Sequence, residues 1–239
     1  MADVLAIVTS DPGRPRLTWY GDGGERIELS GAVVANWVAK TTNLLVEEFD
    51  VAPGVRVGLD LPVHWRTAVW ALAVWRAGGE VTLGPDAGTA DVVVTDRPGT
   101  HAAATALVAV ALPALARRFE GDLPAGAVDA AGAVMTYGDA VGWAPPVDPA
   151  AAALTTADAA VPHAALAAWA RAGAAEPGAR TLLTAAEDRE PGVTTLLRTT
   201  LGVLGGDGSL VVLARSVADD LGKDPSRMER LTRAERITG

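Results

Sequence analysis

The stretch VRVGLDLPVHWRTAVWALAVWRAGGEVTL, residues 55–83, decides the fold. Residues 55–61 are mostly apolar, contain β-branched valines and are followed by a proline, which predicts a buried strand. Residues 65–77 carry Ala, Val, Leu and Trp on most sides and end at a Gly-Gly pair, which predicts a buried helix. Residues 80–83 predict the next strand. A strand, a helix and a strand within about 30 residues form a right-handed crossover unit, whose strands pair in parallel.

The same alternation of strands and helices continues on both sides of this unit. Residues 17–20 and 26–29 flank a Gly-Asp-Gly-Gly sequence, which predicts a hairpin because glycine accepts the positive φ of a tight turn. A helix is expected from about Gly31 to Phe49. Further strands are expected at 91–95, 151–155, 180–185 and 209–214, and further helices at 128–137, 162–171, 193–204 and 225–236. Residues 106–112 fit a strand or part of a helix. The fold class is therefore α/β, with a largely parallel sheet flanked by helices.

The chain of 239 residues is long enough to bury a full core, and we expect a single α/β domain over residues 1–239. Three prolines lie within residues 143–149. A proline-rich segment is typical of a linker, so the alternative is two halves, 1–142 and 150–239, joined by this segment.

Composition excludes several classes of function. The net charge of −9 argues against nucleic acid and anionic membranes as partners, because both attract basic proteins. The absence of cysteine excludes disulfides and thiolate metal sites. The longest largely apolar stretch, residues 102–116, is shorter than the roughly 20 residues that a membrane span needs. We therefore expect a soluble, cytoplasmic protein.

Local motifs for catalysis or metal binding are weak. No serine lies in a G-x-S-x-G elbow, and none of His64, His101 and His163 is followed three or four residues later by a second His or a carboxylate. His64 does follow a predicted strand, where ligands gather in open α/β sheets. Asp60 ends the same strand but has no partner visible in the sequence. Residues 205–208, Gly-Gly-Asp-Gly, follow a helix and precede a strand, which predicts a tight connection, since a dinucleotide fingerprint has the opposite order.

The order of elements over residues 26–83 carries a resemblance. A hairpin and a helix lead to Pro53-Gly54, to a strand with Arg-Val before Leu-Pro, and to an alanine-rich helix ending in Ala-Gly. Residues 196–213 and Glu235-Arg236-Ile237-Thr238 continue the pattern. This order resembles the acyl-adenylate-forming enzymes, which include acyl-CoA synthetases, luciferases and adenylation domains, up to their Glu-x-x-Thr element. The chain also resembles a group of short, stand-alone relatives of these enzymes that has no assigned function.

The resemblance implies a phosphate-binding loop, Tyr-Thr-Ser-Gly-Thr-Thr-Gly-x-Pro-Lys-Gly, which falls on residues 154–164 when its proline is matched to Pro162. The family's threonine, serine and proline correspond to Thr155, Thr156 and Pro162. The other positions are changed: the loop glycines become Ala157 and Ala160, the paired threonines Asp158 and Ala159, the lysine His163, and the final glycine Ala164. Such loops turn glycine N–H groups and a lysine towards phosphate. We therefore expect this loop to repel a triphosphate.

The resemblance also implies that the family's adenine-binding, ribose-binding and metal-binding motifs, and its mobile domain with the catalytic lysine, would follow Gly239. We therefore expect a truncated pseudoenzyme with no catalytic residue of the family and no cofactor, which acts as a binding or scaffold module. A homodimer or a protein partner is expected.

Two alternatives stay open. One is a nucleotide or acyl sensor or carrier that uses a residual crevice near the strand ends, with His64, Asp158 and His163 as its candidate residues. The other is an enzyme of another class on the same frame, with Asp60, Asp158 or His163 as acid or base, because fold alone does not set function.

Overall fold

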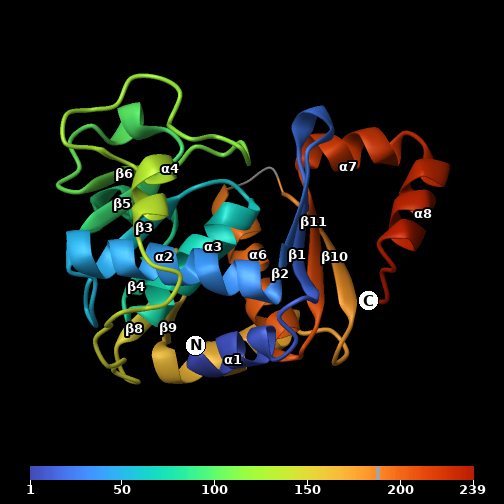
Figure 1. The fold of residues 1–239 in the computed structure, drawn as a ribbon, viewed down its shortest axis with the longest axis horizontal. Helices are drawn as coiled ribbons and strands as arrows, with labels where there is room; N and C mark the ends of the chain where they lie inside the picture. The colour runs from blue at the N-terminus through green and yellow to red at the C-terminus, as the bar shows by residue number, and fades with distance from the viewer. Residues whose placement is uncertain (187–188) are drawn as a thin grey trace. The chain divides into compact units, whose positions relative to one another are not determined.

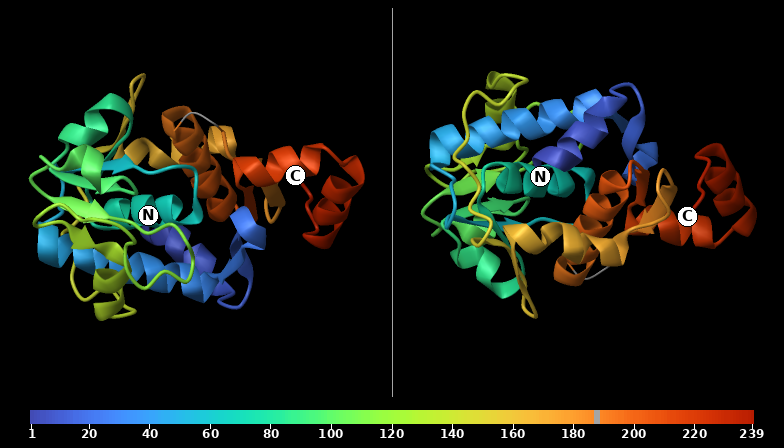
Figure 2. Two further views of the ribbon diagram at one scale, coloured as in Figure 1. Left: turned by 90° about the horizontal axis from the view of Figure 1, so that it is seen from above. Right: turned by 90° about the horizontal axis from the view of Figure 1, so that it is seen from below.

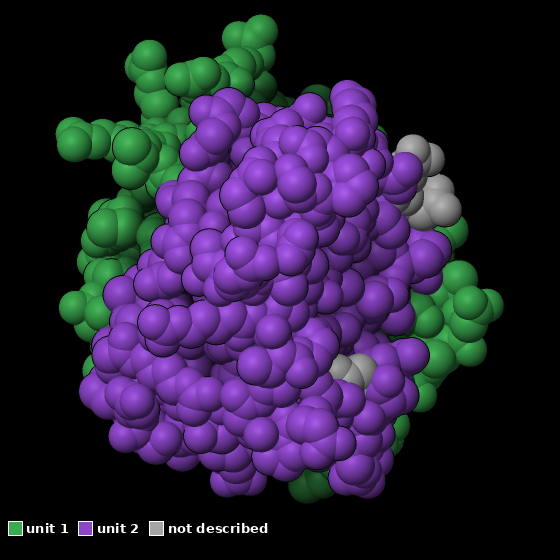
Figure 3. All heavy atoms as spheres, turned by 90° about the vertical axis from the view of Figure 1, so that its right-hand side faces the viewer, with its two compact units in different colours: residues 1, 36–62, 69–166 green, residues 2–35, 63–68, 167–239 purple. Residues whose placement is uncertain are grey.

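The computed structural model describes residues 1–186 and 189–239, which form two compact units. Unit 1 comprises Met1 and residues 36–62 and 69–166, and unit 2 comprises residues 2–35, 63–68 and 167–239. The units are coloured separately in Figure 3. Each unit holds one sheet, and each is assembled from segments that are distant in sequence. The expected single domain, and the alternative of two halves joined by residues 143–149, stay predictions.

The sheet of unit 1 has seven strands in the order β7-β6-β5-β3-β4-β8-β9 (Figure 1). The strands are β3 (Arg56–Asp60), β4 (Glu80–Thr82), β5 (Val92–Thr95), β6 (Leu107–Ala109), β7 (Val128–Asp129), β8 (Ala152–Thr155) and β9 (Ala160–Pro162). All neighbours pair in parallel except β8 and β9, which are antiparallel. The predicted crossover and the largely parallel sheet are confirmed.

Two long helices, whose residues 36–49 and 69–76 belong to unit 1, pack together. The helices are α2 (Gly31–Phe49), at its predicted bounds, and α3 (Trp65–Arg76). They run side by side in Figures 1 and 2, and the buried Thr42 hydroxyl of α2 lies 3.4 Å from the Ala73 carbonyl oxygen of α3. The indole nitrogen of Trp75 donates to the Ala153 carbonyl at 2.6 Å, which joins α3 to β8. Nearly all-round burial explains why α3 is apolar on most sides.

Alanine-rich segments depart from the prediction. The expected helix at 128–137 starts as β7 and continues as the short helices α4 (Ala130–Ala133) and η4 (Val134–Thr136), because the Asp129 carboxylate accepts from the Ala131 N–H at 2.9 Å and caps α4. The expected helix at 162–171 is split as well. Its start belongs to β9, followed by η5 (His163–Ala165), α5 (Leu166–Ala170) and η6 (Arg171–Gly173). Three remaining 3₁₀ turns are η1 (Asp22–Gly24), η2 (Gly84–Thr89) and η3 (Pro98–His101).

The sheet of unit 2 has four strands in the order β10-β11-β1-β2. They are β1 (Pro15–Tyr20), β2 (Arg26–Ser30), β10 (Arg180–Thr184) and β11 (Ser209–Leu213), and its helices are α1 (Ala2–Ser10), α6 (Arg189–Gly205), α7 (Arg215–Gly222) and α8 (Pro225–Ala234). The β1–β2 hairpin is confirmed, with Gly23 and Gly24 at φ 66° and 82°. Helices α1 and α7 were not predicted. Within the described residues, no helix has both the length and the apolar character needed to cross a membrane.

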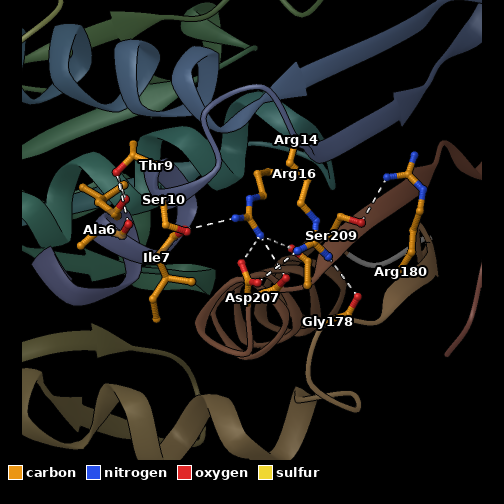
Figure 4. A network of polar contacts seen from close by, with 12 residues as sticks. Ala6, Ile7, Thr9, Ser10, Arg14, Arg16, Gly178, Arg180, Asp207 and Ser209 are labelled. Carbon is orange, nitrogen blue, oxygen red and sulfur yellow. Dashed lines mark hydrogen bonds and ion pairs between the residues drawn. The ribbon is translucent and has the colours of Figure 1, made fainter.

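A buried arginine, Arg16, joins two segments of unit 2 that are distant in sequence (Figure 4). The Arg16 side chain is fully buried, and its Nη1 lies 2.7 Å from the Asp207 carboxylate. Nη1 also donates to the carbonyls of Asp207 and Gly208, and Nη2 donates to the Ile7 carbonyl at 3.1 Å, near the end of α1. Arg14 reaches the same carboxylate at 3.1 Å from a more exposed position. One guanidinium group therefore satisfies carbonyls of two separate segments.

The Gly-Gly-Asp-Gly segment is the predicted tight connection, running from α6 to β11. Asp207, and not a glycine, has the positive φ of 59° in this connection. Aspartate tolerates this conformation better than most residues, and here its carboxylate also meets Arg14 and Arg16.

Replacing Arg16 should destabilise unit 2 strongly. We expect Arg16→Ala to lower the free energy of unfolding by about 3 kcal/mol, because it removes hydrogen bonds to three buried or partly buried carbonyls and the ion pair of a fully buried side chain with Asp207. Arg14→Ala is the matched control at the same carboxylate and should cost under about 1 kcal/mol, since its ion pair is partly exposed. Urea denaturation at pH 7 measures both values. Equal losses in the two variants would show that burial of Arg16 contributes nothing special.

Candidate functional site

The segment aligned with a phosphate loop folds as the turn of a β-hairpin. Strands β8 and β9 pair on either side of it, with Thr155 opposite Ala160. The Thr156 N–H donates to the Ala159 carbonyl at 2.8 Å and closes the turn. The Thr156 hydroxyl oxygen lies 3.3 Å from the Asp158 nitrogen and 3.1 Å from the Ala159 nitrogen, so it accepts from both. Two N–H groups of the turn are therefore directed at a side chain of the turn itself.

This geometry differs from that of an anion-binding loop. A phosphate loop leaves successive N–H groups free to converge on the anion. Here the hydroxyl oxygen of Thr156 takes the place of the anion as acceptor. Asp158 adds an exposed carboxylate on the same turn. Ala160 and Val161 are committed to the strand pairing. The expected repulsion of a triphosphate stays a prediction, and these contacts give it a structural reason.

The histidine at the position of the family lysine is turned onto the backbone. His163 Nε2 lies 3.0 Å from the Gly78 carbonyl oxygen and 3.2 Å from that of Gly79. Both partners are acceptors, so Nε2 carries the proton and donates. Partial burial lowers the pKa of His163, although the two carbonyls oppose the shift. The backbone N–H groups of His163 and Ala164 donate to the carbonyls of Ala151 and Pro149, at 3.0 and 2.9 Å. This histidine fastens η5 to the connection between α3 and β4.

His64 is a buried residue of unit 2. Its side chain is 4% exposed, and its ring meets the Trp19 ring edge to face at 4.5 Å. Its Nδ1 accepts from the Arg66 N–H at 3.1 Å. Burial, and then the charge of Arg66, lower the pKa of His64 to about 3. The three residues proposed for a crevice thus have three different surroundings: His64 is buried, Asp158 is exposed on a turn, and His163 donates to carbonyls.

Asp60 has partners that the sequence did not reveal. Its carboxylate accepts from Arg97 Nη2 at 2.8 and 3.0 Å and from the Thr95 hydroxyl at 3.2 Å, and it lies 2.8 Å from His101 Nε2. The parallel register of β3 and β5 sets Asp60 opposite Thr95 and so assembles the group at the carboxyl ends of both strands. Sequence distance hid these contacts, because the partners lie 35 to 41 residues away.

The Asp60 cluster has a defined chemical capacity. A carboxylate that accepts from Nε2 fixes the tautomer of a neutral histidine and leaves Nδ1 as the acceptor. Gly88 keeps space beside the ring, since a Cβ there would lie 3.1 Å from His101 Nδ1. A carboxylate–histidine pair such as Asp60 and His101 can hold the histidine ring in position to act as a base. Among the described residues, no group of three or more His, Asp or Glu side chains is arranged to hold a metal ion.

A cavity of about 450 Å³ opens where β5 and β6 end in unit 1. Its walls are mainly apolar, with Asp96 and Arg118 among the charged groups, and it is lined by Val110, Leu112, Leu115 and Phe119. The Phe119 N–H donates to the Asp129 carboxylate at 2.8 Å, which fixes the loop that forms one wall. The sequence did not predict this cavity, because residues 110–120 carry no periodic pattern.

The carboxylate of the Glu-x-x-Thr element is offset by two arginines of unit 2. Glu235 is 7% exposed and accepts from the Tyr20 hydroxyl at 2.5 Å, from Arg26 and from Arg180. Burial alone would raise the pKa of Glu235, but the hydrogen bonds from Tyr20, Arg180 and Arg26 outweigh it and lower the pKa. The Thr238 hydroxyl accepts from the Arg180 N–H at 2.9 Å. The element closes the end of the chain onto β10.

The burial of His64 predicts a pH-dependent stability. Its folded pKa of about 3 lies below the ordinary value of 6.5, so the unfolded chain takes up the proton first and stability falls as pH drops through this window. Between pH 7 and pH 5, this histidine should lower the free energy of unfolding by about 2 kcal/mol. A His64→Phe variant lacks the titrating group, so its free energy of unfolding should fall by about 2 kcal/mol less over the same range. Urea denaturation of both proteins at the two pH values measures the difference. Parallel losses in the two proteins would contradict a buried neutral histidine.

The Thr156 contacts predict the behaviour of two backbone amides. In Thr156→Val the amides of Asp158 and Ala159 lose their acceptor, so their hydrogen exchange should accelerate by about tenfold. Thr156→Ser keeps a hydroxyl and should exchange like the parent protein. Exchange followed by NMR tests both variants. Unchanged protection in Thr156→Val would mean that the hydroxyl does not hold the turn closed.

Comparison with known proteins gives one relative by sequence and several by structure. No protein-family model matches the chain. It is 41% identical over 145 residues to the "TIGR03089 family protein" of Mycobacterium tuberculosis strain H37Rv, an alignment that covers 56% of this chain and 58% of that protein. The match thus covers less than two thirds of the relative's length.

Solved structures with this architecture are larger enzymes. Acyl-CoA synthetase of Brucella canis matches 93% of this chain and 48% of its own, with a TM-score of 0.66 and 18% identity. Acetoacetyl-CoA synthetase of Streptomyces lividans matches 89% of this chain and 38% of its own (TM-score 0.68, 19% identity). The nonribosomal peptide synthetase FmoA3 matches 99% of this chain and 24% of its own (TM-score 0.65, 22% identity). The chain therefore has the fold of the N-terminal part of acyl-CoA synthetases, as the resemblance in its sequence implied.

Proposed function

We propose that this protein is a non-catalytic module with an acyl-adenylate-synthetase-like fold, which acts by binding or as a scaffold. The observation that carries the proposal is the hairpin turn in which the Thr156 hydroxyl accepts from the N–H groups of Asp158 and Ala159. A nucleotide would have to break both hydrogen bonds before these groups could meet its phosphates. The fold alone does not argue for activity, because folds host many functions.

Electrostatics support the same proposal. A carboxylate about 4 Å from a phosphate charge costs roughly 1 to 4 kcal/mol, depending on the local dielectric. Asp158 supplies such a charge, and the lysine that would offset it is replaced by His163, whose Nε2 proton is directed at Gly78 and Gly79. Glu235, in the Glu-x-x-Thr element, is already surrounded by two guanidinium groups and a phenol. We propose a protein or a second copy of the chain as partner.

The cavity at the ends of β5 and β6 favours a second candidate, a small-molecule sensor or carrier. Its volume of about 450 Å³ and its mainly apolar walls suit a ligand of modest size. It lies at the carboxyl edge of a parallel sheet, where ligands of open α/β folds bind. His64, Asp158 and His163 do not line it. The Asp60–His101 pair supports a third candidate, an enzyme of another class, more weakly, since the pair alone defines no substrate.

ATP–pyrophosphate exchange tests the non-catalytic proposal. The purified chain should give no exchange with acetate, longer fatty acids, benzoate or amino acids, because its turn lacks the donors for the triphosphate. An active acyl-CoA synthetase assayed in parallel is the positive control. Robust exchange with any of these acids would refute the proposal.

Thermal unfolding of the same preparation separates the candidates. Millimolar ATP should give no stabilisation, whereas a ligand at 100 times its Kd adds about 2.7 kcal/mol. Stabilisation by a fatty acid or acyl-CoA that is lost in Phe119→Ala would select the sensor or carrier, because this residue lines the cavity. A flat response to all ligands would count against that candidate.

A further inference from the structure

The four-stranded sheet of unit 2 has two borders that differ. Its order, β10-β11-β1-β2, places β10 at one border and β2 at the other. The start of β10 is tied to the end of the chain, because the N–H groups of Thr238 and Gly239 donate to the Arg180 carbonyl at 3.0 and 3.4 Å. Within the described residues, β2 pairs only with β1 (Figure 1). The border formed by β2 is therefore the one to which a further strand could be added.

The hydrogen bonds of the hairpin show which backbone groups of β2 point away from β1. In an antiparallel pair, every second residue directs both its N–H and its carbonyl at the neighbouring strand. The Gly21 N–H donates to the Glu25 carbonyl at 2.9 Å, which fixes this alternation along the hairpin. Ile27 therefore directs its backbone groups at β1, whereas Arg26 and Glu28 direct theirs away from it.

The same two residues carry opposite charges at this border. Arg26 and Glu28 are both exposed and lie on one face of β2, with Nη2 of Arg26 2.7 Å from the Glu28 carboxylate and 2.9 Å from that of Glu235. Charges on an edge strand usually hinder the addition of another strand. Opposite charges two residues apart act differently towards an identical strand, because antiparallel pairing around Ile27 sets each arginine opposite a glutamate.

We propose that β2 pairs with β2 of a second copy of this chain, antiparallel and two-fold symmetric about Ile27. The inference rests on the proposed function in one respect, since it names the surface for the second copy given there as a partner. Arg26 of each copy exchanges backbone hydrogen bonds with Glu28 of the other, and the two side chains form an ion pair across the border. A guanidinium has five N–H donors and a carboxylate several acceptor sites, so both keep their contacts within the chain.

The two Ile27 residues complete the pair on the opposite face of the sheet. They meet at a position without hydrogen bonds, where side chains of neighbouring strands come closest. A pair centred on Glu28 is less favourable, because the two Glu28 carboxylates would then stand opposite each other. Another extended peptide offers the same backbone groups, but it matches both charges only if it repeats their spacing. The sequence Arg26-Ile27-Glu28 is complementary to itself.

Sedimentation velocity of the full chain, from micromolar to submillimolar concentration, tests the proposal. The chain should show a reversible monomer–dimer equilibrium. Glu28→Arg sets arginines opposite each other at the border and should raise the dimer Kd by at least about tenfold. Glu47→Arg makes the same change of charge at an exposed position of α2 and should leave the Kd unchanged. A chain that stays monomeric over this range, or an unchanged Kd in Glu28→Arg, would overturn the proposal.

Single cysteines test the register and decide the matter if Glu28→Arg fails to fold. The natural chain has no cysteine, so each variant reports on one position. The two Ile27→Cys positions of the pair have Cα atoms about 4.5 Å apart, so mild oxidation should cross-link the copies. The two Glu28→Cys positions lie about 8 Å apart, too far for a disulfide. Cross-linking of Ile27→Cys no faster than that of Glu28→Cys or of Glu47→Cys would refute the pair.

These results are independent of the test of the proposed function. Oligomeric state is measured without ATP or acids, and ATP–pyrophosphate exchange is measured without reference to mass. A monomeric chain without exchange activity would overturn the β2 pair alone. A dimer that catalyses exchange would overturn the non-catalytic proposal and leave the β2 pair standing.

Discussion

Parallel pairing around β3 is the constraint on which unit 1 depends. Because β5, β3, β4 and β8 run in one direction, the carboxyl ends of these strands lie along one edge of the sheet. Asp60 and Thr95 meet there, the cavity lined by Phe119 opens there, and Thr155 leads from there into its hairpin turn. The backbone pairing sets where these positions lie, and the residues that occupy them set the local chemistry. The chemistry of this edge therefore depends on which residues stand at these positions, and not on a change in the strand order.

The hairpin turn illustrates how a small substitution changes such an edge. Alanine at 157 and 160 leaves the chain able to turn, but the turn then closes on the hydroxyl of Thr156. Hydrogen bonds made within a turn need no ligand to be satisfied, so the backbone gains nothing from an anion. The same holds for Glu235 in unit 2, whose carboxylate accepts hydrogen bonds from Arg26 and Arg180. In both places polar groups are satisfied inside the chain.

Strong periodicity made most elements predictable from the sequence. The bounds of α2 were correct, and β3, α3 and the β1–β2 hairpin were found within a residue or two, because burial repeats regularly along them. The prediction was wrong in alanine-rich segments such as 128–137, where one helix was expected, since alanine fits helix, strand and turn at little cost in packing.

The candidate site was less accessible to prediction than the fold. The contacts of Asp60 join residues brought together only by strand order, and the burial of His64 depends on Trp19, which lies far away in the sequence. The phosphate-loop alignment of residues 154–164 stays a prediction about function, although the turn that the segment forms is now defined.

The two outermost strands of the seven-stranded sheet have a consequence for self-association. β7 has two residues, and β9 has three and ends in Pro162, which has no N–H to offer. Long, regular borders invite another chain to add a strand, whereas such abbreviated ones give it almost nothing to pair with. A dimer that adds a strand to the seven-stranded sheet is therefore disfavoured at both of these borders, and so is continuous extension of this sheet into fibres.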